Sequence, residues 1–125
     1  MAYESDDYAE ANKQFDQVSG NEKYAEKLSY YKSDMSFKSG DFQKAIDLGI
    51  KAMPNSTAEE KSELNKIIGE SYFNLIQYDK AIPYLVGYKG KKGKWNNTDF
   101  YQLGYAYYVQ KDYENAISQF NKIID

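Results

Sequence analysis

One short pattern recurs four times along the chain at nearly constant spacing. Each copy ends on an alanine preceded by an aromatic residue, and the alanines Ala11, Ala45, Ala81 and Ala116 are 34, 36 and 35 residues apart. A period of this length is typical of proteins that stack one supersecondary unit repeatedly, because each unit buries its apolar face against the next. The period therefore predicts an array of similar units in one domain covering residues 1–125.

Each unit reads as two amphipathic helices joined by a short break. In the last unit, Phe100, Leu103, Gly104 and Tyr107 follow the i, i+3, i+4, i+7 spacing of one helix face, and a second apolar face begins at Tyr113. The same reading applied along the chain predicts an all-α fold of about seven helices. Their expected ranges are 7–18, 21–38, 41–53, 57–75, 79–88, 97–110 and 113–124.

Small residues occupy matched positions in the last two units. Gly69 and Ala81 in one unit, and Gly104 and Ala116 in the next, stand where two antiparallel helices approach most closely. Glycine inside a helix costs about 1 kcal/mol relative to alanine, so close packing must offset it. We therefore predict that each pair meets across its hairpin.

Three further expectations concern helix ends. Thr57 and Glu60 have the spacing of a capping box. With Asp79 as N-cap, Pro83 would be the fourth helical residue, where a missing N–H costs little. The last helix is expected to expose Ile117, Phe120 and Ile124.

The motif of the last unit resembles the tetratricopeptide repeat. The family pattern W-x2-L-G-x2-Y…A-x3-F appears as Phe100-x2-Leu103-Gly104-x2-Tyr107…Ala116-x3-Phe120. The resemblance implies a right-handed α-solenoid of antiparallel helix hairpins, in a segment of a longer protein. The composition, without arginine and with many lysines, asparagines and tyrosines, is typical of a bacterial source. The units would cover approximately residues 1–25 (second helix only), 26–61, 62–96 and 97–125 (truncated).

The resemblance also implies a function and a binding face. Proteins of this family are non-enzymatic interaction modules or scaffolds, and their first helices line a concave groove that binds a peptide or a partner helix. Carried over by position, the groove would display a mixed aromatic and charged set of side chains. These are Tyr30, Asp34 and Phe37, then Lys66, Glu70 and Phe73, then Tyr101, Tyr105 and Tyr108.

The segment 87–95 is the other unusual stretch, because it is rich in glycine and lysine. Lys89, Lys91, Lys92 and Lys94 could bind an anion, but the Gly-Lys-Ser/Thr ending of a nucleotide-binding loop is absent. We favour a solvated turn between units, with Trp95 anchoring it on the next helix. A structural spacer within a larger assembly is a further alternative.

Charge is distributed unevenly. Residues 1–26 carry seven acids against two lysines, whereas residues 80–98 carry five lysines and no acid. Opposite fields at the two ends would favour end-to-end self-association. The net charge of −3 and the absence of arginine argue against a nucleic-acid partner.

The amino-acid composition excludes several kinds of catalytic site. The chain has no cysteine, histidine or arginine, which removes thiolate nucleophiles, imidazole bases and bidentate phosphate clamps. Glu59, Glu60 and Glu63 cluster at helical spacing, which is typical of an exposed face. We therefore expect no enzyme, no cofactor and no metal. The chain offers no signal-like start and no apolar run long enough to insert into a membrane. The sequence leaves the compartment open between the cytoplasm and, where the parent carries a signal peptide, the periplasm.

Overall fold

The computed structural model describes residues 22–124, and this part of the chain is all-helical, as predicted. Its α-helices are α2 (Glu22–Lys38), α3 (Phe42–Ala52), α4 (Ala58–Asn74), α5 (Tyr78–Gly87), α6 (Asn97–Val109) and α7 (Tyr113–Phe120). A short 3₁₀-helix, η1 (Met53–Asn55), follows α3. The expected helix over 7–18 and the acidic end of the chain lie outside the described residues.

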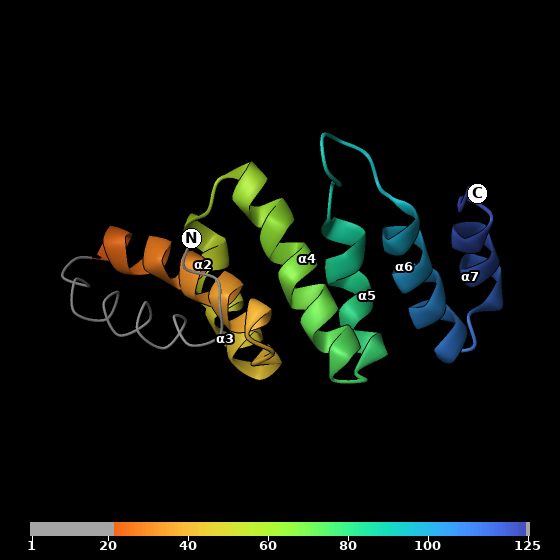
Figure 1. Ribbon diagram of the computed structural model, residues 1–125, viewed down its shortest axis with the longest axis horizontal. Helices are drawn as coiled ribbons and strands as arrows, with labels where there is room; N and C mark the ends of the chain where they lie inside the picture. The colour runs from red at the N-terminus through yellow and green to blue at the C-terminus, as the bar shows by residue number, and fades with distance from the viewer. Residues whose placement is uncertain (1–21, 125) are drawn as a thin grey trace.

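The helices pair into three hairpins, α2–α3, α4–α5 and α6–α7, which stand side by side in an elongated row (Figure 1). This arrangement is the helical repeat that the period predicts. The handedness of the stack stays a prediction. The loop between α5 and α6 projects beyond the ends of both helices, unlike the compact linker at η1 (Figure 1).

The turns inside the three hairpins share one backbone geometry. Gly40, Ile76 and Lys111 occupy the left-handed region with φ of 84°, 63° and 64°. In each turn the N–H of the next residue bonds to a carbonyl five positions back, as in Asp41 N to Ser36 O at 2.8 Å and Asp112 N to Tyr107 O at 3.0 Å. This is a Schellman motif, which ends one helix and starts the next.

We expect Ile76→Gly to stabilise the protein by about 1 kcal/mol. A left-handed conformation costs an L-residue about 1–2 kcal/mol, and Ile76 is β-branched and 73% exposed, so it loses little packing. Urea denaturation measures the change. The matched control is Gly40→Ala, where the added Cβ meets no atom within 4 Å, so only the backbone conformation opposes it. A neutral or destabilising Ile76→Gly variant would contradict the strain argument.

The helix caps confirm one expectation and correct another. Thr57 and Glu60 form a capping box, with Thr57 N–H to Glu60 Oε1 at 2.9 Å and Glu60 N–H to Thr57 Oγ1 at 3.1 Å. The N-cap of α5, however, is Gln77 and not Asp79. Pro83 is therefore the sixth helical residue, two residues deeper than predicted, and α5 loses one backbone hydrogen bond there. The prediction failed because the repeated turn geometry at Ile76 fixes where α5 begins.

Glycines allow the helices to approach closely, but their neighbours differ from the predicted ones. A Cβ on Gly69 would lie 2.8 Å from Leu85, and one on Gly104 would lie 2.6 Å from Phe120. The side chain nearest each glycine therefore lies one helical turn beyond Ala81 or Ala116, although both alanines are fully buried. Consequently each glycine accommodates the large residue at the end of the A-x3-F motif.

The α2–α3 hairpin is joined in part through a buried serine. Ser33 is buried, and its hydroxyl donates a 2.7 Å hydrogen bond to the carbonyl of Ala45 on α3. A Cβ on Gly49 would lie 3.0 Å from the Ser33 hydroxyl, so this hairpin closes on small polar side chains where the others use apolar ones.

Two apolar clusters join neighbouring hairpins. The first is built around Ile46, Leu64 and Ile68 and links α3 to α4, and the second links Leu85 on α5 to Leu103 on α6. At the last helix, Ile117 and Ile124 are exposed, as expected. Phe120 is half-buried instead, because it packs on Gly104 and the Tyr101 ring.

Candidate binding surfaces

An aromatic cluster runs along α6 and links it to the helices on both sides. We call this cluster the tyrosine surface, and its members are Phe73, Tyr78, Tyr101, Tyr105, Tyr108 and Tyr113. Tyr105 is its centre, with its ring centroid 5.9 Å from Phe73 and 5.9 Å from Tyr101. The cluster therefore spans the junction between the last two hairpins.

Part of the tyrosine surface faces solvent. Tyr101 and Tyr108 are 49% and 54% exposed, whereas Tyr105 between them is half-buried. The Tyr105 ring stacks on Tyr101 with an interplanar angle of 24° and makes an edge-to-face contact with the Tyr78 ring at 5.5 Å. These contacts fix ring orientation, so the exposed faces form a largely preorganised aromatic area.

The predicted binding residues on α2, Tyr30, Asp34 and Phe37, are only partly exposed to solvent. Tyr30 is half-buried, and this burial, with the Glu63 and Asp34 carboxylates nearby, raises its pKa to about 12. Asp34 forms an i,i+4 ion pair with Lys38 at 3.0 Å. Phe37 contacts the core and makes an edge-to-face contact with Phe42 at 5.8 Å. The α2 positions therefore offer less free aromatic area than those on α6.

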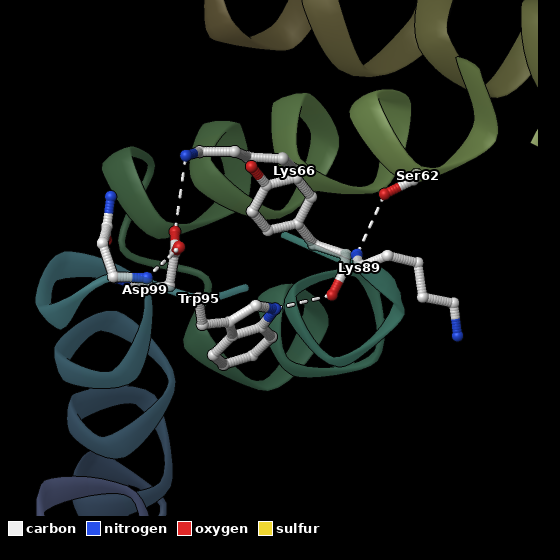
Figure 2. Close-up of polar contacts among 7 residues, drawn as sticks. Ser62, Lys66, Lys89, Trp95 and Asp99 are labelled. Carbon is white, nitrogen blue, oxygen red and sulfur yellow. Dashed lines mark hydrogen bonds and ion pairs between the residues drawn. The ribbon is translucent and has the colours of Figure 1, made fainter. Parts of the chain in front are cut away.

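Among the predicted binding residues on α4, Lys66 makes a polar contact that joins two hairpins. Lys66 Nζ lies 3.4 Å from Asp99 Oδ1 on α6 and 4.8 Å from the centre of the Tyr88 ring (Figure 2). Burial lowers the pKa of Lys66, but the Glu70 and Asp99 carboxylates outweigh that effect, so its pKa is raised. Burial raises the pKa of Glu70 despite a hydrogen bond from Gln102. The Lys66–Asp99 ion pair therefore joins α4 to α6.

Sequence reasoning missed Asp99, although a signal was present. Asp99 is 6% exposed and completes a capping box with Asn96, in which Asn96 N–H donates to Asp99 Oδ2 at 3.0 Å. The spacing of an Asn followed three residues later by Asp would have predicted that cap. Its second role, as the partner of Lys66, depends on how two hairpins meet.

The lysine-rich loop is anchored to the scaffold at both sides (Figure 2). Trp95 Nε1 donates a 2.7 Å hydrogen bond to the carbonyl of Tyr88, and the backbone N–H of Lys89 donates to Ser62 Oγ at 2.9 Å. Lys91 and Lys94 pair as a single antiparallel bridge across the turn. Trp95 thus lies where the sequence places its anchoring role, and the side chains of Lys89, Lys91, Lys92 and Lys94 are exposed.

The surroundings of this loop include acids. An open hollow of about 390 Å³ beside the loop is lined by Glu59 and Glu63 together with Lys89, Lys91 and Lys92. Carboxylates facing the same space weaken the positive field that an anion would meet.

Residues 100–125 match a family model described as tetratricopeptide repeat. This part of the chain is therefore similar to a tetratricopeptide repeat. The match covers α6 and α7, the hairpin whose motif is most complete, and such repeats generally mediate protein–protein interaction. A search of curated proteins finds no match to the chain.

Two features, a membrane-spanning helix and a metal-binding cluster, are absent from the described part of the chain. Within residues 22–124, no helix has the length and apolarity needed to cross a membrane. The same residues contain no group of three or more acidic side chains arranged to hold a metal ion.

Proposed function

We propose that this protein is a non-enzymatic interaction module that binds a protein partner through the tyrosine surface. The partner would present an extended peptide or a helix. The observation that carries this proposal is the ordered, half-exposed row of Tyr101, Tyr105 and Tyr108 on a first helix of the repeat array.

Tyrosine suits this task for a physical reason. Its ring offers a large, rigid apolar area with few rotatable bonds, and its hydroxyl forms hydrogen bonds that orient a peptide. Binding hot spots are enriched in tyrosine and commonly lose 2 kcal/mol or more on truncation. The neighbouring rings of Phe73 and Tyr78 extend the same area toward α4 and α5.

The double variant Tyr101→Ala/Tyr105→Ala should reduce the affinity for a peptide selected on the wild-type protein at least about thirtyfold, equivalent to about 2 kcal/mol. A displayed peptide library supplies the ligand, and titration calorimetry measures its affinity for wild type and variant. Circular dichroism checks that helicity is retained.

The matched control is Ile50→Ala, which truncates an exposed apolar side chain on the second helix α3. It should leave the affinity of the same peptide unchanged. Equal affinity of the wild type and the tyrosine double variant would remove the tyrosine surface as the binding face.

Two other functions considered from the sequence, anion binding and a spacer role, remain as alternatives. The four exposed loop lysines keep weak anion binding as an alternative, although Glu59 and Glu63 share their surroundings. A spacer role would show as failure of the library to yield any peptide bound by the folded protein.

A further inference from the structure

A second hollow, of about 500 Å³, lies between the last two hairpins and the lysine-rich loop. Its walls are mainly apolar and aromatic, and two lysines and a glutamine complete the lining. The residues that matter for the argument are Val86, Trp95, Phe100, Tyr107, Gln119 and Lys122, with Lys89 at the loop side. This volume is within the range of about 300–1,000 Å³ found for ligand pockets.

The hollow uses a different face of α6 from the tyrosine surface. At about 100° of rotation per residue, Phe100, Leu103 and Tyr107 point away from Tyr101, Tyr105 and Tyr108. The two surfaces can therefore be tested independently, and the inference does not rest on the proposed function.

The preceding repeat shows why the space is open here. Alignment on Ala81 and Ala116 makes Tyr84 the counterpart of Gln119. Tyr84 fills its position, with its ring 5.9 Å from Tyr72 and against the apolar cluster of the neighbouring hairpin. Gln119 has no ring to place on the equivalent Tyr107, so the last junction keeps a hollow that the previous one fills.

The same alignment pairs Gly87 with Lys122. In the preceding hairpin Gly87 lies against α4, where its carbonyl accepts a 3.2 Å hydrogen bond from the side chain of Asn65. In the last unit the counterpart of Asn65 is Phe100, and Lys122 Nζ lies 5.8 Å from the centre of its ring. Where the preceding hairpin has a neutral hydrogen bond between Asn65 and Gly87, the last unit therefore has the Phe100 ring with the Lys122 ammonium near it.

The aromatic wall is held in place. The indole N–H of Trp95 bonds to the carbonyl of Tyr88, and its ring lies between Tyr88 at 6.4 Å and Phe100 at 5.4 Å. Ordering such side chains on binding costs about 0.5–1.5 kcal/mol each, so a preformed wall favours affinity.

We propose that this hollow binds an acidic peptide segment of a protein partner, with a large apolar side chain of that segment inserted between Trp95, Phe100 and Tyr107. The charge of the rim selects the acidic partner, since the lining contains Lys89 and Lys122 and no carboxylate. Lys94 on the adjoining loop adds positive charge, whereas Glu59 and Glu63 partly offset the loop lysines that line the neighbouring hollow. The aromatic walls select the apolar side chain.

The chain provides its own reporter, because Trp95 is the single tryptophan and lines the hollow. The probe is the acetylated peptide Asp-Asp-Phe-Asp-Asp, titrated into the intact protein at low salt while tryptophan emission is recorded. We expect saturable quenching or a spectral shift that weakens as salt is added. No change in emission at any attainable peptide concentration would overturn the proposal.

Two control peptides separate the contributions. Asp-Asp-Ala-Asp-Asp lacks the aromatic ring, and Lys-Lys-Phe-Lys-Lys reverses the charge, so each should bind at least about tenfold more weakly. If the alanine peptide matches the phenylalanine peptide, binding is surface electrostatics and the hollow plays no part.

The sharpest variant is Gln119→Tyr, which copies the residue that fills the previous junction. It should fold at least as stably as the wild type and lower the probe affinity at least about tenfold. Its matched control is Ser118→Tyr, at a neighbouring exposed position, which should leave affinity unchanged.

Charge is tested with Lys89→Gln/Lys122→Gln against the exposed control pair Lys51→Gln/Lys61→Gln. The first pair should lower affinity at least about tenfold, and the second less than about twofold. If the Gln119→Tyr variant and the Lys89→Gln/Lys122→Gln variant both bind the probe with wild-type affinity, the peptide binds outside this hollow. The Tyr101→Ala/Tyr105→Ala variant should still bind this probe.

Discussion

Ile46→Ala is expected to lower the free energy of unfolding by about 2–5 kcal/mol, whereas Ile117→Ala should change it by less than about 0.5 kcal/mol. The two isoleucines follow Ala45 and Ala116 and so occupy the same position of the repeat. Ile46 is 1% exposed because α4 covers it, and Ile117 is 57% exposed at the last helix. Urea denaturation of both variants measures the difference.

This contrast isolates the contribution of stacking. The substitution, the repeat position and the preceding alanine are the same, so we attribute most of the difference in stability to the neighbouring hairpin. Ile82, the equivalent residue on α5, is half-buried and packs against the second cluster, so Ile82→Ala should fall between them. Equal losses at positions 46 and 117 would mean that hairpins do not stabilise one another through this residue.

The Ile117 variant also bears on self-association. Ile117 on α7 and Ile124 beyond its end are exposed apolar side chains at the end of the row of hairpins, where a further hairpin would pack in a longer array. If copies of this chain associate end to end through that helix, Ile117→Ala weakens the association in sedimentation experiments without lowering the stability of the monomer. End-to-end association stays a prediction of the sequence.

The helices themselves were predictable because the repeat supplies several independent readings of each boundary. The range 57–75 predicted from the capping box and the apolar period corresponds to Ala58–Asn74, and 41–53 corresponds to Phe42–Ala52. In both cases the N-cap side chain, Thr57 or Asp41, specifies the start locally. Hairpin pairing follows from the short turns.

Features set by non-local contacts were not predictable in this way. Position 76 has no glycine to mark its left-handed turn, so the start of α5 was placed two residues too late. Small residues predicted the close approach of helices, but not that Leu85 and Phe120 fill the space beside the glycines. The Lys66–Asp99 contact and the hollow at Gln119 depend on how consecutive hairpins meet, which no local pattern encodes.

Asp99→Ala is the second substitution with a large expected effect, a loss of about 2–4 kcal/mol in the free energy of unfolding. It removes the N3 carboxylate of the α6 capping box, which accepts a hydrogen bond from the Asn96 N–H, and leaves half-buried Lys66 without its Asp99 partner. Asp99→Asn should lose less, because an amide oxygen can still accept the hydrogen bond from the Asn96 N–H. Chemical denaturation at neutral pH measures both variants.

A double-mutant cycle then separates the ion pair from the cap. Lys66→Met removes the charge but keeps an apolar chain near the Tyr88 ring, so the double variant Lys66→Met/Asp99→Asn buries no unmatched charge from this pair. Because a buried pair can be replaced by neutral groups more cheaply than it can be broken, the double variant should be more stable than the sum of the two single losses predicts, by about 0.5–3 kcal/mol. Strict additivity would instead mean that Lys66 and Asp99 do not stabilise the α4–α6 junction through each other, and that Asp99 acts only as a helix cap.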